Sequence, residues 1–386
     1  MIDPGKEPGQ GTDHKTGFEM KFIVLSPKNR TAYNFRGDLI KELISRGYEV
    51  IVTGPDRTDV EKIEALGARF AIIPLDKNGT SVFGDLKYCR ALTSFLRAEK
   101  PDAVMGYTVK PVVYGSIAAK RAGVKNVTGL ITGAGYTFIS TSPKARILGM
   151  IVRRLYRIGL GKADHVIFQN RDDLQEFCQR KLVDPGKCSF VNGSGINLDY
   201  YRTVPLPEKP AFFMLSRLLK SKGVREYLEA AERVKEKYPS VQFFILGNYE
   251  NSMQDAVERE YVEGFIRRGL VQRFEETDDV RPFYRMCSVY VLPSYREGTP
   301  RTVLEAMAMG RPIITTDTQG CRETVIEGVN GFLVPARNSD SVAEKMIWFI
   351  EHPDQIAEMG KKSRRYAEEK FDVNKINDKM LRIMQI

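Results

Sequence analysis

Two glutamates in the segment EGTPRTVLE, Glu297 and Glu305, have the spacing that most directly indicates chemistry. The apolar run VYVLPS before them predicts a strand, and Thr299 and Pro300 suit the N-cap and the first position of a helix. Glu297 would then lie in the loop after the strand, and Glu305 in the second turn of the helix. Free backbone N–H groups at a helix start favour phosphate, whereas a carboxylate can accept hydrogen bonds from two hydroxyls. Phosphate between two sets of hydroxyls is the layout of a nucleotide sugar.

Two cations in the segment SRLLKSKG, Arg217 and Lys222, give the second indication. Arg217 ends a predicted strand, and Lys222 begins the next predicted helix. Arginine binds phosphate groups in a bidentate manner and lysine acts as a point charge, so the two together suit a diphosphate. They would also offset the negative charge that develops on a departing diphosphate.

Each motif also has a simpler interpretation when it is taken alone. The two glutamates could be a solvated pair on a loop and a helix, and the two cations could be solvated loop residues. Their occurrence together, at matching positions of one predicted domain, favours a common site.

The elements that must position these residues alternate between strands and helices. This alternation is typical of βαβ units and of a parallel sheet. The segment VPLPEKP (204–210), with its three prolines, predicts a linker between two such halves. The expected strands are 21–27, 48–55, 69–75, 102–107, 125–133, 165–170, 188–195, 211–217, 241–247, 289–294, 311–317 and 331–336. The expected helices are 36–47, 58–66, 83–99, 111–123, 143–161, 171–181, 222–237, 253–268, 279–286, 300–309, 320–327, 338–351 and 353–370.

The predicted fold class is therefore α/β, with two doubly wound Rossmann-like domains that face a central cleft. We expect residues 1–19 to be a leader or disordered, 20–204 to form the N-terminal domain, 205–370 the C-terminal domain, and 371–386 a C-terminal tail. Doubly wound sheets bind ligands at the carboxyl ends of their strands, so the cleft is the expected site.

The composition excludes several classes of protein. Hydrophobic residues make up 42% and charged residues 28%, as in soluble globular proteins, and no apolar run is long enough to span a membrane. Residues 1–19 lack the apolar region of a signal peptide. Five cysteines without CxxC spacing and three scattered histidines argue against a disulfide framework, a metal site and a nucleophilic triad. We expect the chemistry to rest on carboxylates, cations and backbone amides.

The net charge of +10 predicts an anionic partner, and the segment 143–162 carries a concentrated part of it. Apolar residues recur there at helical spacing, and a basic amphipathic helix predicts contact with an anionic membrane surface. This indicates a cytoplasmic protein, peripheral on the inner face of the cell membrane. Alternatively, the apolar face packs into the core of the protein. No nucleic-acid motif accompanies the segment, which argues against nucleic acid. Its basic residues are Lys144, Arg146, Arg153, Arg154, Arg157 and Lys162.

The pairing of SRLLKSKG with EGTPRTVLE resembles family 4 of the retaining glycosyltransferases, and GCRETVIEGVNGFLVP (320–335) also resembles that family. The resemblance extends over nearly all of the chain from Met20. It implies the GT-B fold, a nucleotide-diphosphate sugar in the C-terminal half, an acceptor bound mainly by the N-terminal half, and no metal or other cofactor. By the same resemblance, Glu297, Arg217 and Lys222 are the catalytic candidates. The implied donor-binding set is Arg217, Lys222, Glu297, Gly298, Thr299, Pro300, Arg301 and Glu305, with Glu305 on the ribose, Glu297 on the transferred sugar and the two cations on the diphosphate.

Three segments of the first half resemble a narrower subgroup: YNFRGDLIKEL, YTVKPVVYGSIAAKRAG and ITGAGYTF. This subgroup extends polyprenyl-diphosphate-linked saccharides in bacterial glycan assembly and includes N-acetylgalactosaminyltransferases. One departure from the wider family is the loop SPKNRTAYNFRG, which stands where many members have a Gly-Gly loop. Its basic residues, Lys28, Arg30 and Arg36, could meet an acceptor diphosphate. The acceptor-binding candidates are Asn34, Arg36, Lys110, Gly135 and Tyr136.

The preferred interpretation is a retaining glycosyltransferase that moves a hexosamine, with GalNAc favoured, from a UDP-sugar to a polyprenyl-diphosphate-linked saccharide. The uracil base is implied by the resemblance. Two alternatives stay open: a UDP-sugar epimerase, and a non-catalytic binding protein of glycan assembly. A nucleotide-dependent dehydrogenase is disfavoured, because the turns after the first strand of each half lack GxGxxG.

Overall fold

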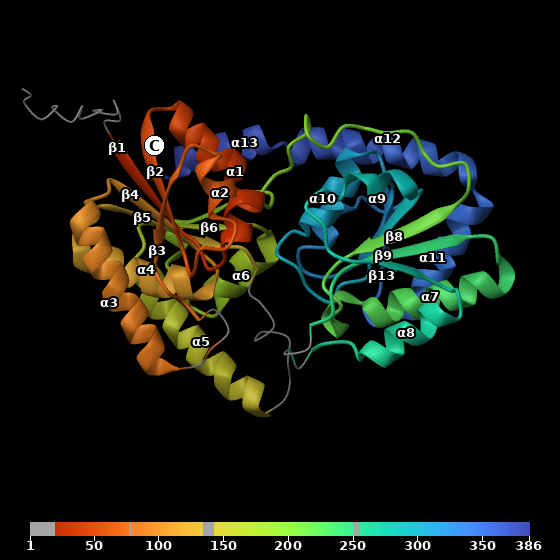
Figure 1. Ribbon diagram of the computed structural model, residues 1–386, viewed down its shortest axis with the longest axis horizontal. Helices are drawn as coiled ribbons and strands as arrows, with labels where there is room; N and C mark the ends of the chain where they lie inside the picture. The colour runs from red at the N-terminus through yellow and green to blue at the C-terminus, as the bar shows by residue number, and fades with distance from the viewer. Residues whose placement is uncertain (1–19, 77–78, 80, 134–142, 251–252, 254) are drawn as a thin grey trace, which may run out of the picture.

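The computed structural model describes residues 20–386, apart from 77–78, 80, 134–142, 251–252 and 254. The described residues form two α/β domains that lie side by side, each with a parallel sheet between layers of helices (Figure 1). Strands that are apolar on both faces explain these layers, because such strands need cover on both sides. The predicted fold class, two doubly wound domains, is confirmed.

The sheet of the first domain has the order β3-β2-β1-β4-β5-β6-β7, so the strand order reverses between β1 and β4. Its strands are β1 (Met20–Leu25), β2 (Tyr48–Gly54), β3 (Arg69–Ile72), β4 (Ala103–Tyr107), β5 (Asn126–Ile131), β6 (His165–Phe168) and β7 (Cys188–Phe190). Its helices are α1 (Asn29–Ser45), α2 (Val60–Glu64), α3 (Val82–Glu99), α4 (Val109–Ala122), α5 (Pro143–Gly161), α6 (Arg171–Gln179) and the 3-10 turn η2 (Pro185–Lys187).

The sheet of the second domain has the order β10-β9-β8-β11-β12-β13, and its order reverses between β8 and β11. Its strands are β8 (Ala211–Leu215), β9 (Gln242–Leu246), β10 (Gln272–Phe274), β11 (Val289–Leu292), β12 (Ile313–Thr316) and β13 (Gly331–Val334). Its helical elements are η3 (Lys220–Lys222), α7 (Val224–Lys237), α8 (Arg259–Arg267), α9 (Arg281–Met286), α10 (Arg301–Ala308), η4 (Arg322–Thr324), α11 (Ser339–Glu351) and α12 (Pro353–Lys370).

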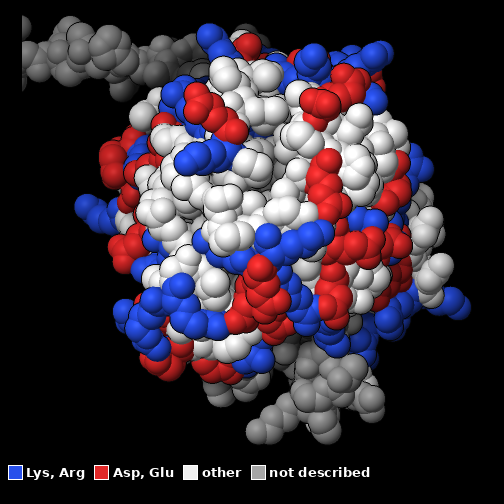
Figure 2. Space-filling model, turned by 90° about the vertical axis from the view of Figure 1, so that its right-hand side faces the viewer, with Lys and Arg blue, Asp and Glu red and all other residues white. Residues whose placement is uncertain are grey.

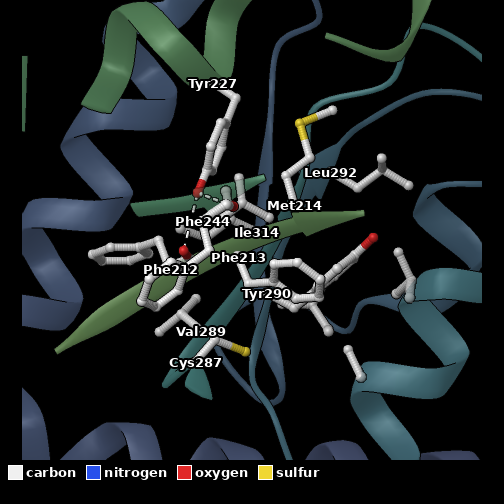
Figure 3. Packing of buried hydrophobic residues seen from close by; sticks show 14 of the residues in the cluster. Phe212, Phe213, Met214, Tyr227, Phe244, Cys287, Val289, Tyr290, Leu292 and Ile314 are labelled. Atoms are coloured by element: carbon white, nitrogen blue, oxygen red, sulfur yellow. Dashed lines mark hydrogen bonds between the residues drawn. The ribbon is translucent and has the colours of Figure 1, made fainter. Parts of the chain in front are cut away.

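The core of the second domain is rich in aromatic side chains. Phe212 and Phe213 alternate on β8 and pack on opposite faces of the sheet, as a strand requires. The buried hydroxyl of Tyr227, on α7, donates to the carbonyls of Phe212 at 3.0 Å and Phe244 at 2.8 Å (Figure 3). These hydrogen bonds fix α7 against β8 and β9, and the carboxyl end of β8 leads to the candidate site.

The structure differs from the sequence-based elements at several ends. The helices expected over 58–66, 253–268 and 320–327 are shorter, as α2, α8 and the single turn η4. The strand β10 was not expected, because three residues leave little alternating pattern to detect.

The segment that we expected to be a tail forms helix α13 (Val373–Ile383), which packs against α1 of the first domain. Ile376, Met380 and Leu381 are buried in the core that lies under α1 and β1. The chain therefore crosses between the domains twice, before β8 and after α12, and its last helix completes the first domain (Figure 1).

The two crossings lie against each other. The Ile196 N–H donates to the Phe371 carbonyl at 2.7 Å, and the Val373 N–H donates back to the Ile196 carbonyl at 3.1 Å. Gly195 adopts φ +71°, and a Cβ atom there would lie 2.6 Å from the Cα of Val373. A residue without a side chain is needed at this close approach. Both connections between the domains are thus joined into one hinge.

Candidate active site

The candidate site lies where β8 and β11 end, at the reversal of strand order in the second domain. Arg217 and Lys222 follow β8, and Glu297 follows β11, so the fold brings both sequence motifs to one edge of the sheet. A crevice at such a reversal is where open α/β sheets bind their ligands.

Lys222 and Glu297 form the central contact of this edge. The Lys222 ammonium lies 2.5 Å from Oε1 of Glu297, which also accepts a hydrogen bond from the Ser294 hydroxyl at 2.7 Å. The Glu297 side chain is 15% exposed, and its Oε2 forms no hydrogen bond with the residues that the structure describes. One carboxylate oxygen is therefore held in place while the other stays available.

Arg217 occupies a more open position on the same edge. Its side chain is 54% exposed, and its guanidinium contacts Sδ of Met253 at 3.4 Å and a carboxylate oxygen of Glu250 at 4.0 Å. Within the described part of the chain it contacts neither Lys222 nor Glu297. The structure thus brings Lys222 and Glu297 together and leaves Arg217 beside them.

Glu305 is buried on α10, and both of its oxygens are occupied. Tyr201 donates to Oε1 at 3.1 Å, Tyr284 donates to Oε2 at 3.0 Å, and the guanidinium of Arg301 lies 3.5 Å from Oε1. Burial raises the pKa of the Glu305 carboxyl, whereas Arg301 and the two tyrosine hydroxyls act in the opposite direction. The sequence pattern did not identify Tyr201 or Tyr284, which come from the domain crossing and from α9.

The start of α10 differs from the expectation. Pro300 is the N-cap residue and the helix begins at Arg301, one residue later than expected. The Thr299 hydroxyl does not cap the helix; it donates to the Gln169 carbonyl of the first domain at 2.9 Å and to the Gly298 carbonyl at 3.0 Å. Pro300 suits this extended position before the helix, because its ring fixes φ and its nitrogen carries no N–H group that would need an acceptor.

The loop that carries Glu297 is clamped to the first domain. Arg296 pairs with Asp173 and, at 2.6 Å, with Glu176, both on α6, and all three side chains are largely buried. Asn170, the N-cap residue of α6, donates to the Gly298 carbonyl at 2.7 Å. Sequence reasoning did not identify Arg296. The only feature of the sequence that could have indicated its role is its position directly before Glu297.

Gly298 is required by this close contact between the domains. A Cβ atom on Gly298 would lie 1.9 Å from the Thr132 carbonyl oxygen, and one on Gly133 would lie 3.1 Å from the Gly298 nitrogen. Gly133 also adopts φ +135°. Two glycines from different domains therefore let the two backbones touch beside Glu297.

Arg36 is the acceptor-side candidate with the most unusual surroundings. Its side chain is buried on α1 over the ring of Tyr107, 5.3 Å from the centroid, and its Nε has no hydrogen-bond partner among the described residues. Burial lowers its pKa to about 10, and the nearby cation Arg301 of the second domain acts in the same direction. Tyr107 ends β4, at the reversal of strand order in the first domain.

The other acceptor-side candidates are placed differently. Asn34 is exposed on α1. Lys110 is turned into its own domain, where its ammonium donates to the Asp76 and Gly79 carbonyls at 2.8 Å and to Asp85 at 2.6 Å. Its three donors are thus occupied, at a cavity of 420 Å³ between the ends of β2 and β3 and helix α3. Gly135 and Tyr136 lie outside the described residues.

Two further observations concern metals and membranes. In the described part of the chain, no group of three or more His, Cys, Asp or Glu side chains is arranged to hold a metal ion. Among the described helices, none is both long and apolar enough to cross a membrane.

Known proteins resemble this chain in sequence and in fold. Residues 23–170 match the family described as "Glycosyl transferase 4-like", and residues 202–366 match "Glycosyl transferases group 1". The chain is 27% identical to the N,N'-diacetylbacillosaminyl-diphospho-undecaprenol alpha-1,3-N-acetylgalactosaminyltransferase of Campylobacter jejuni, over 94% of this chain and 98% of that protein. It is 26% identical to the UDP-Gal:alpha-D-GlcNAc-diphosphoundecaprenol alpha-1,3-galactosyltransferase of Escherichia coli, over 81% and 82% of the two chains.

Solved structures show the same fold at lower identity. Anabaena HepE in complex with UDP-glucose superposes with a TM-score of 0.78 at 20% identity, over 95% of this chain and 100% of that chain. Sucrose-phosphate synthase from Thermosynechococcus elongatus gives 0.80 at 18%, over 95% and 98%. These likenesses show the fold. The two family matches, which together take in most of both domains, show that the chain is a glycosyltransferase of family 4 with the GT-B fold.

Proposed function

We propose that this glycosyltransferase transfers a hexosamine, with GalNAc favoured, from a UDP-sugar to a polyprenyl-diphosphate-linked saccharide, with retention of anomeric configuration. The observation that carries the proposal is the Lys222–Glu297 pair at the reversal of strand order. It places a cation beside a carboxylate of which one oxygen forms no hydrogen bond with the described residues. The donor and acceptor classes rest on the similarity to the C. jejuni and E. coli enzymes, whose names state such substrates.

The donor would lie along the carboxyl edge of the second sheet. Glu297 would bind hydroxyls of the transferred sugar through the oxygen that no described residue occupies. Lys222 is close enough to Glu297 to contact the adjacent diphosphate, and Arg217, with its exposed side chain, can swing onto that diphosphate from outside. Glu305 would accept hydrogen bonds from the ribose hydroxyls in addition to those from its two tyrosines, since each carboxylate oxygen has two lone pairs.

A front-face reaction suits this arrangement, since we assign no side chain as a nucleophile at the anomeric carbon. The bond from the anomeric carbon to the diphosphate oxygen breaks, and the acceptor hydroxyl oxygen bonds to the same face of that carbon. The hydroxyl proton passes to the departing diphosphate. Lys222 and Arg217 would stabilise the charge on that diphosphate, and Glu297 would hold the sugar in position.

The acceptor would enter from the first domain, where Arg36 faces the second domain without a carboxylate partner among the described residues. A buried guanidinium whose Nε has no partner among the described residues is costly unless an anion joins it, and the acceptor diphosphate is such an anion. Arg30 is less available, because it pairs with Glu276 of the second domain at 2.7 Å. We further propose a cytoplasmic location on the inner face of the membrane, with α5 as the contact.

A UDP-release assay tests the proposal directly. Purified protein is given a panel of UDP-sugars, with and without polyprenyl-diphosphate-linked GlcNAc or GalNAc in detergent. Release that requires the acceptor with one donor supports the transferase and identifies its sugar. Loss of a UDP-sugar without any acceptor supports the epimerase alternative, and UDP-sugar binding without turnover across the panel supports the binding protein. NMR of the product's anomeric signal tests retention.

A further inference from the structure

A second basic site lies on the first domain, in residues that do not form the candidate active site. A hollow of 350 Å³ opens between α5 and the segment that follows α6. Its lining consists of four arginines and two apolar side chains: Arg153, Arg154, Arg157, Arg180, Met150 and Leu182. We refer to this hollow as the arginine pocket. None of its lining residues belongs to the donor or acceptor candidates.

The positive charge of the arginine pocket is only partly compensated. Arg180 pairs with Glu176 at 2.9 Å, and Arg157 donates to the carbonyls of Lys181 and Arg180. Arg153 and Arg154 form no hydrogen bond or ion pair with the described residues. In contrast, the face of the second domain in Figure 2 shows Lys and Arg residues interspersed with Asp and Glu. An arginine cluster of this kind suits a phosphate group, which it can bind in a bidentate manner.

Helix α5 carries three parallel stripes of side chains. Val152, Tyr156 and Leu160 are buried in the first domain at a spacing of four residues. Met150, Arg153, Arg154 and Arg157 line the pocket. A third stripe of large apolar residues faces solvent: Ile147, Ile151 and Ile158, between 46% and 57% exposed, with the exposed Met150 at its border with the pocket. The helix thus packs on the core through one stripe and exposes a second, so core packing does not account for all of its apolar residues.

The exposed apolar residues and the arginine pocket point outward together. Helix α5 forms the lower edge of the first domain, and its N-terminal end projects below the other helices (Figure 1). Apolar side chains beside an arginine-lined hollow match the boundary between acyl chains and headgroups of a bilayer. A soluble phosphate compound would use the arginines and leave these apolar residues in water.

We propose that the arginine pocket binds the phosphate of an anionic membrane phospholipid, while Ile147, Ile151 and Ile158 enter the acyl layer beside it. The site extends the proposed location on the membrane from general charge attraction to a defined headgroup site. It does not require that the transferase reaction be correct.

The test is sedimentation of the full-length protein with vesicles, which needs no turnover. Neutral phosphatidylcholine vesicles are compared with vesicles that also contain phosphatidylglycerol, and with vesicles in which oleate provides the same charge without a phosphate. We expect binding to be strongest with phosphatidylglycerol. Equal binding to phosphatidylglycerol and oleate vesicles would overturn the headgroup site, because charge alone would then suffice.

Two double variants separate the contributions. Removing two cations near an anionic surface should weaken binding about thirtyfold, so Arg153→Gln with Arg154→Gln should lose most of the phosphatidylglycerol binding. The charge-matched control is Arg365→Gln with Arg382→Gln, two exposed arginines on α12 and α13 that already pair with Glu369 and Asp378. An equal loss in both double variants, with folding verified by circular dichroism, would overturn the proposal.

A further pair of measurements distinguishes a membrane lipid from a soluble phosphate. Ile147→Ser with Ile151→Ser should also reduce vesicle binding, because the apolar stripe no longer enters the bilayer. Glycerol phosphate in solution should compete weakly with the vesicles. Full vesicle binding by the serine variant, or efficient competition by glycerol phosphate, would contradict the membrane lipid as the ligand.

Discussion

The two domains present opposite charge arrangements where their sheets reverse strand order. In the second domain each carboxylate has a cation beside it, with Lys222 at Glu297 and Arg301 at Glu305. In the first domain Arg36 is buried without a carboxylate partner among the described residues. The second domain is therefore preorganised before substrate arrives, whereas the first domain holds a charge that an anionic ligand would satisfy. Four measurements test this contrast between the two domains.

The largest effect is expected at the Lys222–Glu297 pair. Lys222→Ala and Glu297→Gln should each lower kcat about 10²- to 10³-fold, because preorganised charge at the diphosphate and sugar is lost. Steady-state kinetics with the donor identified in the UDP-release panel measures this. Lys220→Gln is the matched control, since Lys220 pairs with Glu258 on the surface two residues earlier. Near-normal turnover in both active-site variants would remove these residues from the catalytic set.

The Arg296 contact, which joins the second domain to the first beside Glu297, should show the next largest effect. Arg296→Met leaves the carboxylates of Asp173 and Glu176 without their cation in a buried seam, which should lower the free energy of unfolding by about 3 kcal/mol or more. Arg322→Gln removes two exposed contacts, with Asp172 at 3.3 Å across the same seam and with Asp317 at 2.7 Å, and should change the free energy of unfolding by less than about 1 kcal/mol. Denaturant unfolding compares the two. Similar losses would mean that burial does not distinguish the two contacts.

Arg36 should show opposite effects on stability and on acceptor use. Arg36→Met removes a buried charge without a carboxylate partner and should raise the free energy of unfolding by about 1 kcal/mol or more. It should also raise KM for the lipid-linked acceptor about tenfold, because a charge-assisted contact is lost. The control is Arg46→Gln. Arg46 stands just beyond the end of α1 and forms an exposed pair with Glu42. A destabilised variant with unchanged acceptor KM would contradict the role of Arg36.

The smallest effect concerns pH and Glu305. Burial raises the pKa of Glu305 in the folded protein, so the folded state holds a proton that the unfolded state releases near its ordinary pKa of about 4.3. The contribution of Glu305 to stability is therefore greatest below that pH and declines as pH rises to the folded pKa. The stability of Glu305→Gln relative to the unaltered protein should rise over this window. A pH-independent difference between the two would show that the tyrosines and Arg301 cancel the effect of burial.

Much of the scaffold could be predicted from the sequence, because its strands and helices follow local periodicity. The same periodicity placed Lys222 and Glu297 after two strands of one predicted domain, and the structure makes those strands neighbours and brings the two side chains into contact. Contacts set by tertiary packing could not be predicted. Tyr201 and Tyr284 reach Glu305 from distant segments, and the Lys110 ammonium is taken up by a loop of its own domain. Local pattern indicates where a side chain starts and does not indicate which partner it meets.

The first domain and helix α13 depend on each other in a way that affects how the protein is made. The core under α1 contains Ile376, Met380 and Leu381, yet these residues are synthesised after every residue of the second domain. On the ribosome, the first domain must therefore wait with part of its apolar core uncovered while the second domain emerges and folds. The paired crossing at Ile196 and Asp372 can close only after Asp372 has also been synthesised. A chain that stopped before α13 would therefore lack part of the first-domain core and the pairing that joins the two crossings.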